Sequence, residues 1–186
     1  PVPGTPMGYH SKENLALMQK QKETGKGRRG YFYEHGDFPE KDYLDWQIAD
    51  KSIRDLKKLR KQGKPFFLAV GFIRPHLPFV VPQKYWDMYD HSQIEIPDNY
   101  ILKPGNNIPE RALANWSELR AYSGIPEQGP LDEATAKLMI HGYYASVSFV
   151  DAQIGRLLKA LKEEGLDKNT TVVLIGDHGW NLGEHG

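Results

Sequence analysis

The chain has 186 residues, which is about the length of one globular domain. Its 24 basic side chains balance 24 acidic ones and 39% of its residues are hydrophobic, so the composition does not indicate a disordered chain and argues against a nucleic-acid-binding protein. The longest apolar runs, residues 66–72 and 172–175, are far shorter than the roughly 20 residues that cross a bilayer, so no membrane span is expected. The lack of cysteine excludes disulfides, thiolate metal ligands and thiol catalysis within these residues, and it leaves the compartment open.

Residues 1–41 mix prolines, glycines and a short basic run, and they show neither a helical nor a strand period. They predict an irregular arm on the surface. The chain opens on Pro1 instead of an initiator methionine, no secretory hydrophobic region follows, and it stops at Gly186 after a Gly-rich run. We therefore expect a piece of a longer protein.

The next segment predicts a helix followed by a strand. From Asp42, apolar residues recur at helical spacing until Gly63, which predicts a helix of about five turns. Residues 66–72 (FFLAVGF) then form a continuous apolar run, typical of a strand that is covered on both faces. Such a strand indicates a central, largely parallel sheet.

Residues 73–130 contain eight prolines and predict a long, loop-rich excursion with short helices at 84–89 and 110–120. Asp132 is a candidate N-cap for a long helix that ends at Gly165. Its predicted buried stripe is Ile140, Tyr144, Val147, Ile154, Leu158 and Leu161. Residues 170–176 (TTVVLIG) predict a second buried strand, and the alternation of helices and strands favours an α/β layered domain.

Polar residues follow both predicted strands directly. Asp177 and His178 come after the second strand, and ligands gather at the carboxyl ends of strands in open α/β sheets. An Asp at such a position can reach a metal ion or a substrate, and the adjacent Gly179 lets the backbone pass close to it. The same residues are also ordinary in a turn that ends a strand, so both interpretations stay open.

His76 follows the first predicted strand and has a proline on either side of it, at Pro75 and Pro78. The prolines restrict the backbone, so the imidazole is expected in a stiff loop. A stiff imidazole suits acid–base catalysis or anion binding near neutral pH. A packed structural histidine is the alternative. Because both histidines follow predicted buried strands, they are candidates for one shared rim.

Residues 71–79 (GFIRPHLPF) and 176–186 (GDHGWNLGEHG) together resemble the sulfatases of the iduronate-2-sulfatase type. Residues 143–158 (YYASVSFVDAQIGRLL) resemble the long helix of that family, and residues 49–53 resemble the helix before its Phe-rich strand. The resemblance therefore covers most of the chain from about residue 42 onward.

This resemblance implies an alkaline-phosphatase-like α/β fold, a central and largely parallel sheet flanked by helices, with residues 1–186 as the central part of one catalytic domain. It implies hydrolysis of sulfate esters of a sugar or polysaccharide by a formylglycine nucleophile beside a calcium ion. By position, Asp177 and His178 match two calcium ligands, and His76 matches the catalytic histidine near the leaving oxygen. It also implies a periplasmic or secreted protein, lysosomal in an animal, and it gives no oligomeric state.

The sequence also departs from the family pattern. It has no cysteine, and none of its serines begins the Cys/Ser-x-Pro-Ser-Arg motif from which formylglycine arises. The first pair of calcium-binding aspartates and the lysine expected shortly after Gly186 are not among these residues. We therefore expect the 186-residue chain alone to leave sulfate esters intact.

Two other functions are consistent with the same residues. The first is a phosphomonoester, phosphodiester or phosphonate hydrolase of the same fold, with Mn²⁺ or Zn²⁺ in place of Ca²⁺ and a different nucleophile. The second is a catalytically inactive relative that binds sugars through His76 and nearby aromatic residues. The nucleophile motif and the metal content of the intact protein separate these functions from a sulfatase.

Overall fold

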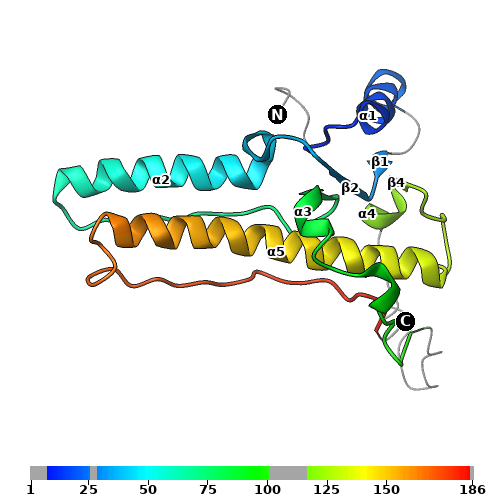
Figure 1. Ribbon diagram of the computed structural model, residues 1–186. Coiled ribbons are helices and arrows are strands. Elements are labelled where there is room, and N and C mark those ends of the chain that lie inside the picture. Colours follow the sequence, from blue (N-terminus) through cyan, green and yellow to red (C-terminus); the bar gives the residue numbers. More distant parts are fainter. Residues whose placement is uncertain (1–7, 26–28, 101–116, 185–186) are drawn as a thin grey trace.

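The computed structural model describes residues 8–25, 29–100 and 117–184. Two long helices, α2 (Leu44–Gln62) and α5 (Glu133–Glu163), lie side by side and run in the same direction (Figure 1). Their C-terminal ends meet where Arg60 Nε donates a hydrogen bond to the carbonyl oxygen of Glu164 at 3.3 Å. After each helix the chain returns in an extended conformation along α5 (Figure 1).

Helix α2 confirms the helix predicted from Asp42 to Gly63. It buries Ala49 and Leu56, and Leu56 packs against Ala160 and Leu161 of α5. Gly63 ends the helix in the left-handed conformation, with φ of 64°, and its N–H donates to the carbonyl oxygen of Arg60. This is a common helix end, because glycine adopts a positive φ without steric cost.

Helix α5 begins as predicted, with the Asp132 carboxylate accepting a hydrogen bond of 2.7 Å from Thr135 N. The predicted buried stripe is wrong in part, because Tyr144, Val147 and Leu158 are 43%, 44% and 44% exposed. The covered face instead carries small, aromatic and amide residues: Ala145, Ser146, Phe149, Gln153 and Ala160. Helix α5 has apolar residues on more than one face, and periodicity alone does not say which face is covered.

Residues 8–25 and 29–41 contain regular structure where the sequence predicted an irregular arm. Helix α1 (Lys12–Thr24) is followed by β1 (Arg29–Tyr31) and β2 (Tyr33–Gly36). Strand β1 pairs in parallel with β4 (Tyr122–Ser123), and β2 pairs in parallel with β3 (Phe79–Pro82). These partners lie far along the chain, so no local pattern in residues 1–41 could indicate the pairing.

Glu34 holds α1 against these strands. Its buried carboxylate accepts hydrogen bonds from His10 N at 2.6 Å, Ser11 Oγ at 2.5 Å and Asn14 Nδ2 at 2.8 Å. Asn14 also accepts a hydrogen bond from Tyr31 N at 2.7 Å. A charged side chain is tolerated at this depth because donors surround it.

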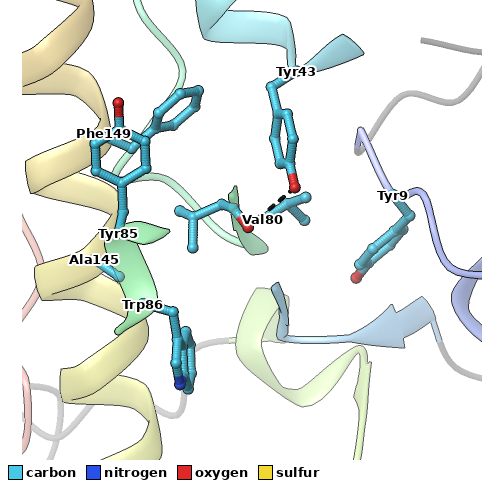
Figure 2. Packing of buried hydrophobic residues seen from close by; sticks show 8 residues of the cluster. Tyr9, Tyr43, Val80, Tyr85, Trp86, Ala145 and Phe149 are labelled. Carbon is cyan, nitrogen blue, oxygen red and sulfur yellow. Dashed lines mark hydrogen bonds between the residues drawn. The ribbon is translucent and has the colours of Figure 1, made fainter. Parts of the chain in front are cut away.

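The core lies between these strands and α5 (Figure 2). Its buried residues are Tyr9, Tyr43, Val80, Val81, Tyr85, Trp86, Ala145 and Phe149. The Tyr43 hydroxyl donates to the carbonyl oxygen of Val81 at 3.3 Å, so the one polar atom of this ring is satisfied inside the core.

The described part of the excursion at 73–130 contains β3, β4 and three short helices, α3 (Gln83–Trp86), η2 (His91–Gln93) and α4 (Ser117–Arg120). Another 3-10 turn, η1 (Glu40–Asp42), precedes α2. Most of the helix predicted at 110–120 lies outside the described residues. All four β3 residues are buried, so part of this excursion belongs to the core.

The strands predicted at 66–72 and 170–176 are extended, but within the described part of the chain neither pairs with a neighbouring strand. Their apolar side chains are largely exposed: Phe67 is 91%, Val173 76% and Ile175 83% accessible. A strand needs a neighbour to take up its backbone hydrogen bonds, and these segments instead lie along α5. The apolar pattern therefore identified extended chain, and the predicted burial on both faces is absent from the described structure.

Candidate active-site rim

The loop that carries His76 is anchored to the start of α2. Asp45, only 1% exposed, accepts a hydrogen bond of 2.6 Å from Ile73 N. Burial raises the pKa of Asp45, and the nearby Arg74 guanidinium and backbone N–H groups act in the opposite direction. Arg74 is also buried, and it donates to the carbonyl oxygens of Val80 at 3.3 Å and His76 at 3.4 Å. The loop is thus held by hydrogen bonds from two buried polar side chains, Asp45 and Arg74.

The imidazole of His76 stands at the edge of this loop, with its side chain 44% exposed. Its Nδ1 lies 2.7 Å from the carbonyl oxygen of Leu77. A carbonyl oxygen only accepts hydrogen bonds, so Nδ1 carries the hydrogen. The opposite nitrogen, Nε2, is therefore the atom that can gain or lose a proton, and it lies 3.7 Å from Oε2 of Glu118 on α4.

The two predicted polar segments meet through Trp180. The ring centroids of His76 and Trp180 are 6.1 Å apart with an interplanar angle of 71°, an edge-to-face contact. Trp180 also packs against the cluster that contains Leu77 and Phe79. The structure therefore brings His76 close to the segment that follows Asp177 and His178, and the shared rim of the two histidines stays a prediction.

Asp177 and His178 project into solvent, with side chains 92% and 65% exposed. Asp177 Oδ1 accepts a hydrogen bond from His178 N at 2.9 Å, and its Oδ2 lies 3.9 Å from His178 Nε2. Across the described ranges, no cluster of three or more His, Cys, Asp or Glu side chains could hold a metal ion.

The donor chemistry of this pair fits a metal site in part. A carboxylate oxygen suits calcium, which takes six to eight oxygen ligands, whereas imidazole is more typical of zinc and transition metals. Asp177 and His178 could supply two ligands, so further ligands would have to come from other segments. The exposure of both side chains leaves room for such ligands.

Sequence reasoning missed Glu118, and it interpreted Arg29 as part of a solvated surface. Arg29 Nη1 lies 3.6 Å from Oε1 of Glu118, on the side of the carboxylate away from His76. Glu118 has no distinguishing local pattern, and the basic run that includes Arg29 is usual for a solvated surface. The β1–β4 pairing brings the two segments together, and it could not be read from either one.

The comparisons with known proteins agree with this architecture. A sequence model of the sulfatase family, described as "Sulfatase", matches residues 7–186. The chain belongs to the sulfatase family. This match confirms the resemblance drawn from residues 71–79 and 176–186, and with it the alkaline-phosphatase-like α/β fold.

Individual relatives are similar over most of this sulfatase chain. Iduronate 2-sulfatase of Mus musculus is 33% identical in an alignment 178 residues long that covers 88% of this chain and 32% of the relative. A sulfatase of Formosa agariphila is 39% identical in an alignment of 170 residues that covers 88% of this chain and 32% of the relative. An arylsulfatase of Clostridium perfringens is 32% identical in an alignment of 148 residues that covers 74% of this chain and 27% of the relative. The chain thus spans about a third of the length of these relatives or less.

Within the described residues, no helix is both long enough and apolar enough to cross a membrane.

Proposed function

We propose that the intact protein hydrolyses sulfate esters, and that this chain supplies the rim on which the leaving group is protonated. The family match carries the proposal, because it extends over His76, Asp177 and His178 together. The contact between His76 and Trp180 supports it, since it holds the His76 loop against the segment that follows Asp177 and His178.

In this proposal His76 is the general acid. With Nδ1–H held by the carbonyl oxygen of Leu77, a protonated ring presents Nε2–H to the solvent side. That hydrogen would pass to the ester oxygen as its bond to sulfur breaks, so that the sugar leaves as a neutral alcohol. General acids of this kind contribute roughly 10²- to 10⁴-fold to a rate.

Asp177 and His178 would hold a calcium ion in the intact protein. When bound, the cation would neutralise charge on the sulfate group and help to activate the nucleophile. The nucleophile is expected to be a formylglycine from another part of the protein, because the motif that produces it is not among the 186 residues. Mn²⁺ or Zn²⁺ would instead favour the phosphoryl hydrolase.

The remaining part of the domain would also complete the sheet. We propose that residues 66–72 and 170–176 pair with strands outside this chain, which would cover side chains such as Phe67 and Ile175. Residues 1–186 would then be the central part of one catalytic domain, and the loops at 80–130 would contribute to substrate specificity.

The proposed substrate is a sulfated sugar or polysaccharide, in keeping with the relative named for iduronate. The proposed location is the periplasm or the extracellular space, or the lysosome if the source is an animal. Both proposals derive from the family alone.

The test uses the intact protein with a panel of monosaccharide sulfates and the matching phosphates, because their alkoxide leaving groups need a proton. We expect release of sulfate that is lost after treatment with a chelator and restored by Ca²⁺, and a fall of roughly 10²- to 10⁴-fold in the His76→Ala variant. Hydrolysis of the phosphate ester alone would favour the phosphoryl hydrolase. Binding of a sulfated oligosaccharide without turnover of either ester would favour the inactive sugar-binding relative.

A further inference from the structure

We propose that Glu118 is a positioning residue for His76, holding the imidazole so that its Nε2 faces the substrate. This inference rests on the proposed role of His76. It gives a function to a carboxylate on a separate helix that the sequence motifs do not include.

Three contacts define the orientation of the His76 ring. The carbonyl oxygen of Leu77 accepts from Nδ1 at 2.7 Å, Trp180 meets the ring edge to face, and Oε2 of Glu118 lies 3.7 Å from Nε2. The first contact sets the tautomer, and the second limits rotation of the ring. Only the third lies beside the nitrogen that would exchange a proton.

The distance of Glu118 suits a positioning role. A separation of 3.7 Å is too long for a hydrogen bond, so the Nε2 hydrogen remains available to an oxygen of the substrate. It is short enough for electrostatic attraction between a carboxylate and an imidazolium. Glu118 would therefore keep the protonated ring turned toward α4 without competing fully for its hydrogen.

Arg29 holds the other side of Glu118. Its Nη1 lies 3.6 Å from Oε1, and its guanidinium stands 5.5 Å from the centre of the Tyr122 ring. The backbone of Arg29 is fixed by a hydrogen bond of 2.8 Å from its N–H to the carbonyl oxygen of Ala121. The carboxylate therefore lies between a guanidinium anchored on β1 and the imidazole of the His76 loop.

The three side chains that follow one another here are partly exposed: Arg29 is 31%, Glu118 29% and His76 44% accessible. Pairs that are exposed to this degree are worth little in stability, because water screens them. The arrangement of Arg29, Glu118 and His76 is thus better explained by orientation of the His76 ring than by a contribution to folding stability.

The experiment compares kcat and KM for the monosaccharide sulfate that the intact protein hydrolyses fastest, in the intact protein and its Glu118→Gln variant. The substitution keeps the shape and removes the charge. We expect kcat to fall about two- to fivefold, the range that an exposed ion pair supports, with KM changed less. Glu118→Asp should recover part of the rate, because it restores the charge on a shorter side chain.

Glu163→Gln is the matched control. Glu163 lies 3.7 Å from Lys159 on the exposed surface of α5, so the control removes an ion pair of the same length outside the rim. We expect its kcat and KM to equal those of the unmodified protein.

The deciding measurement is a double-mutant cycle with His76→Ala. If Glu118 acts through His76, Glu118→Gln will have no further effect on kcat once His76 is replaced. A full effect in that background would overturn the inference, as would an unchanged kcat for Glu118→Gln in a protein that needs His76. If the His76→Ala variant kept full activity, the proposed general acid would be refuted instead. Failure of the positioning role and failure of the general acid are therefore distinguishable.

Discussion

The ring of Phe79 on β3 lies directly against Gly142 on α5. A β-carbon at position 142 would stand 2.7 Å from Cδ2 of this ring, closer than such atoms approach in proteins. The strand and the helix can therefore meet here only because residue 142 has no side chain. Since β3 begins three residues after His76, this contact also sets how close the His76 loop lies to α5.

Gly142→Ala should destabilise the intact protein by about 1–3 kcal/mol, because the added methyl group overpacks a fully buried ring. Gly155→Ala is the matched control in the same helix, since a β-carbon there has no atom within 4 Å. The control should be neutral or stabilising by up to about 1 kcal/mol through helix propensity. Urea unfolding of both variants measures the difference, and equal midpoints would contradict the packing argument.

Glu34→Gln should also lower the free energy of unfolding, by roughly 1–3 kcal/mol. An amide replaces one of the two acceptor oxygens that receive hydrogen bonds from His10, Ser11 and Asn14, and its N–H₂ group would face donors. Glu23→Gln is the control, because Glu23 lies on the exposed surface of α1 and accepts an exposed hydrogen bond from Gln19 in that helix. Thermal melts at pH 7 compare the two, and a similar small shift in both would refute the prediction.

The buried His141 predicts a pH dependence of stability. Burial lowers its pKa below the usual 6.5, the nearby His91 and His35 act in the same direction, and the hydrogen bond to Trp86 and the charge of Asp87 oppose them. The unfolded chain therefore binds the proton more readily than the folded one. As a result, protonation of His141 costs no folding free energy above about pH 6.5, and the free energy of unfolding decreases as the pH falls below that value.

Replacing His141 with Gln should reduce this acid-side loss. The measurement is the unfolding midpoint at pH 7.5 and pH 5.5 for the intact protein and the variant, and the difference between the two pH values is compared. Part of the pH dependence should remain, because burial also lowers the pKa of His10. An unchanged difference in the variant would show that His141 does not contribute.

Asp177→Asn should weaken binding of Ca²⁺ to the chelator-treated intact protein by at least roughly tenfold. Loss of a residue that only hydrogen-bonds to a metal ligand already lowers metal affinity by about this much, and loss of a charged ligand should cost no less. Titration calorimetry with Ca²⁺ alone reads the affinity without using activity. Asp151→Asn on the exposed face of α5 is the control and should bind as tightly as the unmodified protein. Equal affinities for both variants would remove Asp177 from the proposed ligand set.

The sequence predicted the elements that depend on local patterns. Helix α2 with its Gly63 end and the Asp132 cap of α5 follow from spacing and capping chemistry, and both are present. Strands β1 and β2 were missed because their hydrogen-bond partners come from β4 and β3, whereas the local caps of α1, Ser11 and Gly25, were overlooked. The same limit applies to the rim, where the motifs identified His76 and the pairing of distant segments supplied Glu118.

The parallel pairing of β1 with β4 also sets an order in which the chain can fold. Ser123 Oγ donates to the carbonyl oxygen of Arg29 at 2.7 Å across 94 positions of sequence. At roughly 5–20 residues per second, a ribosome needs about 5–20 seconds to make the residues between them. During that time Phe32, which is buried in the finished structure, is not covered by β4. Strand β1 cannot form its backbone hydrogen bonds with β4 until that strand has been synthesised.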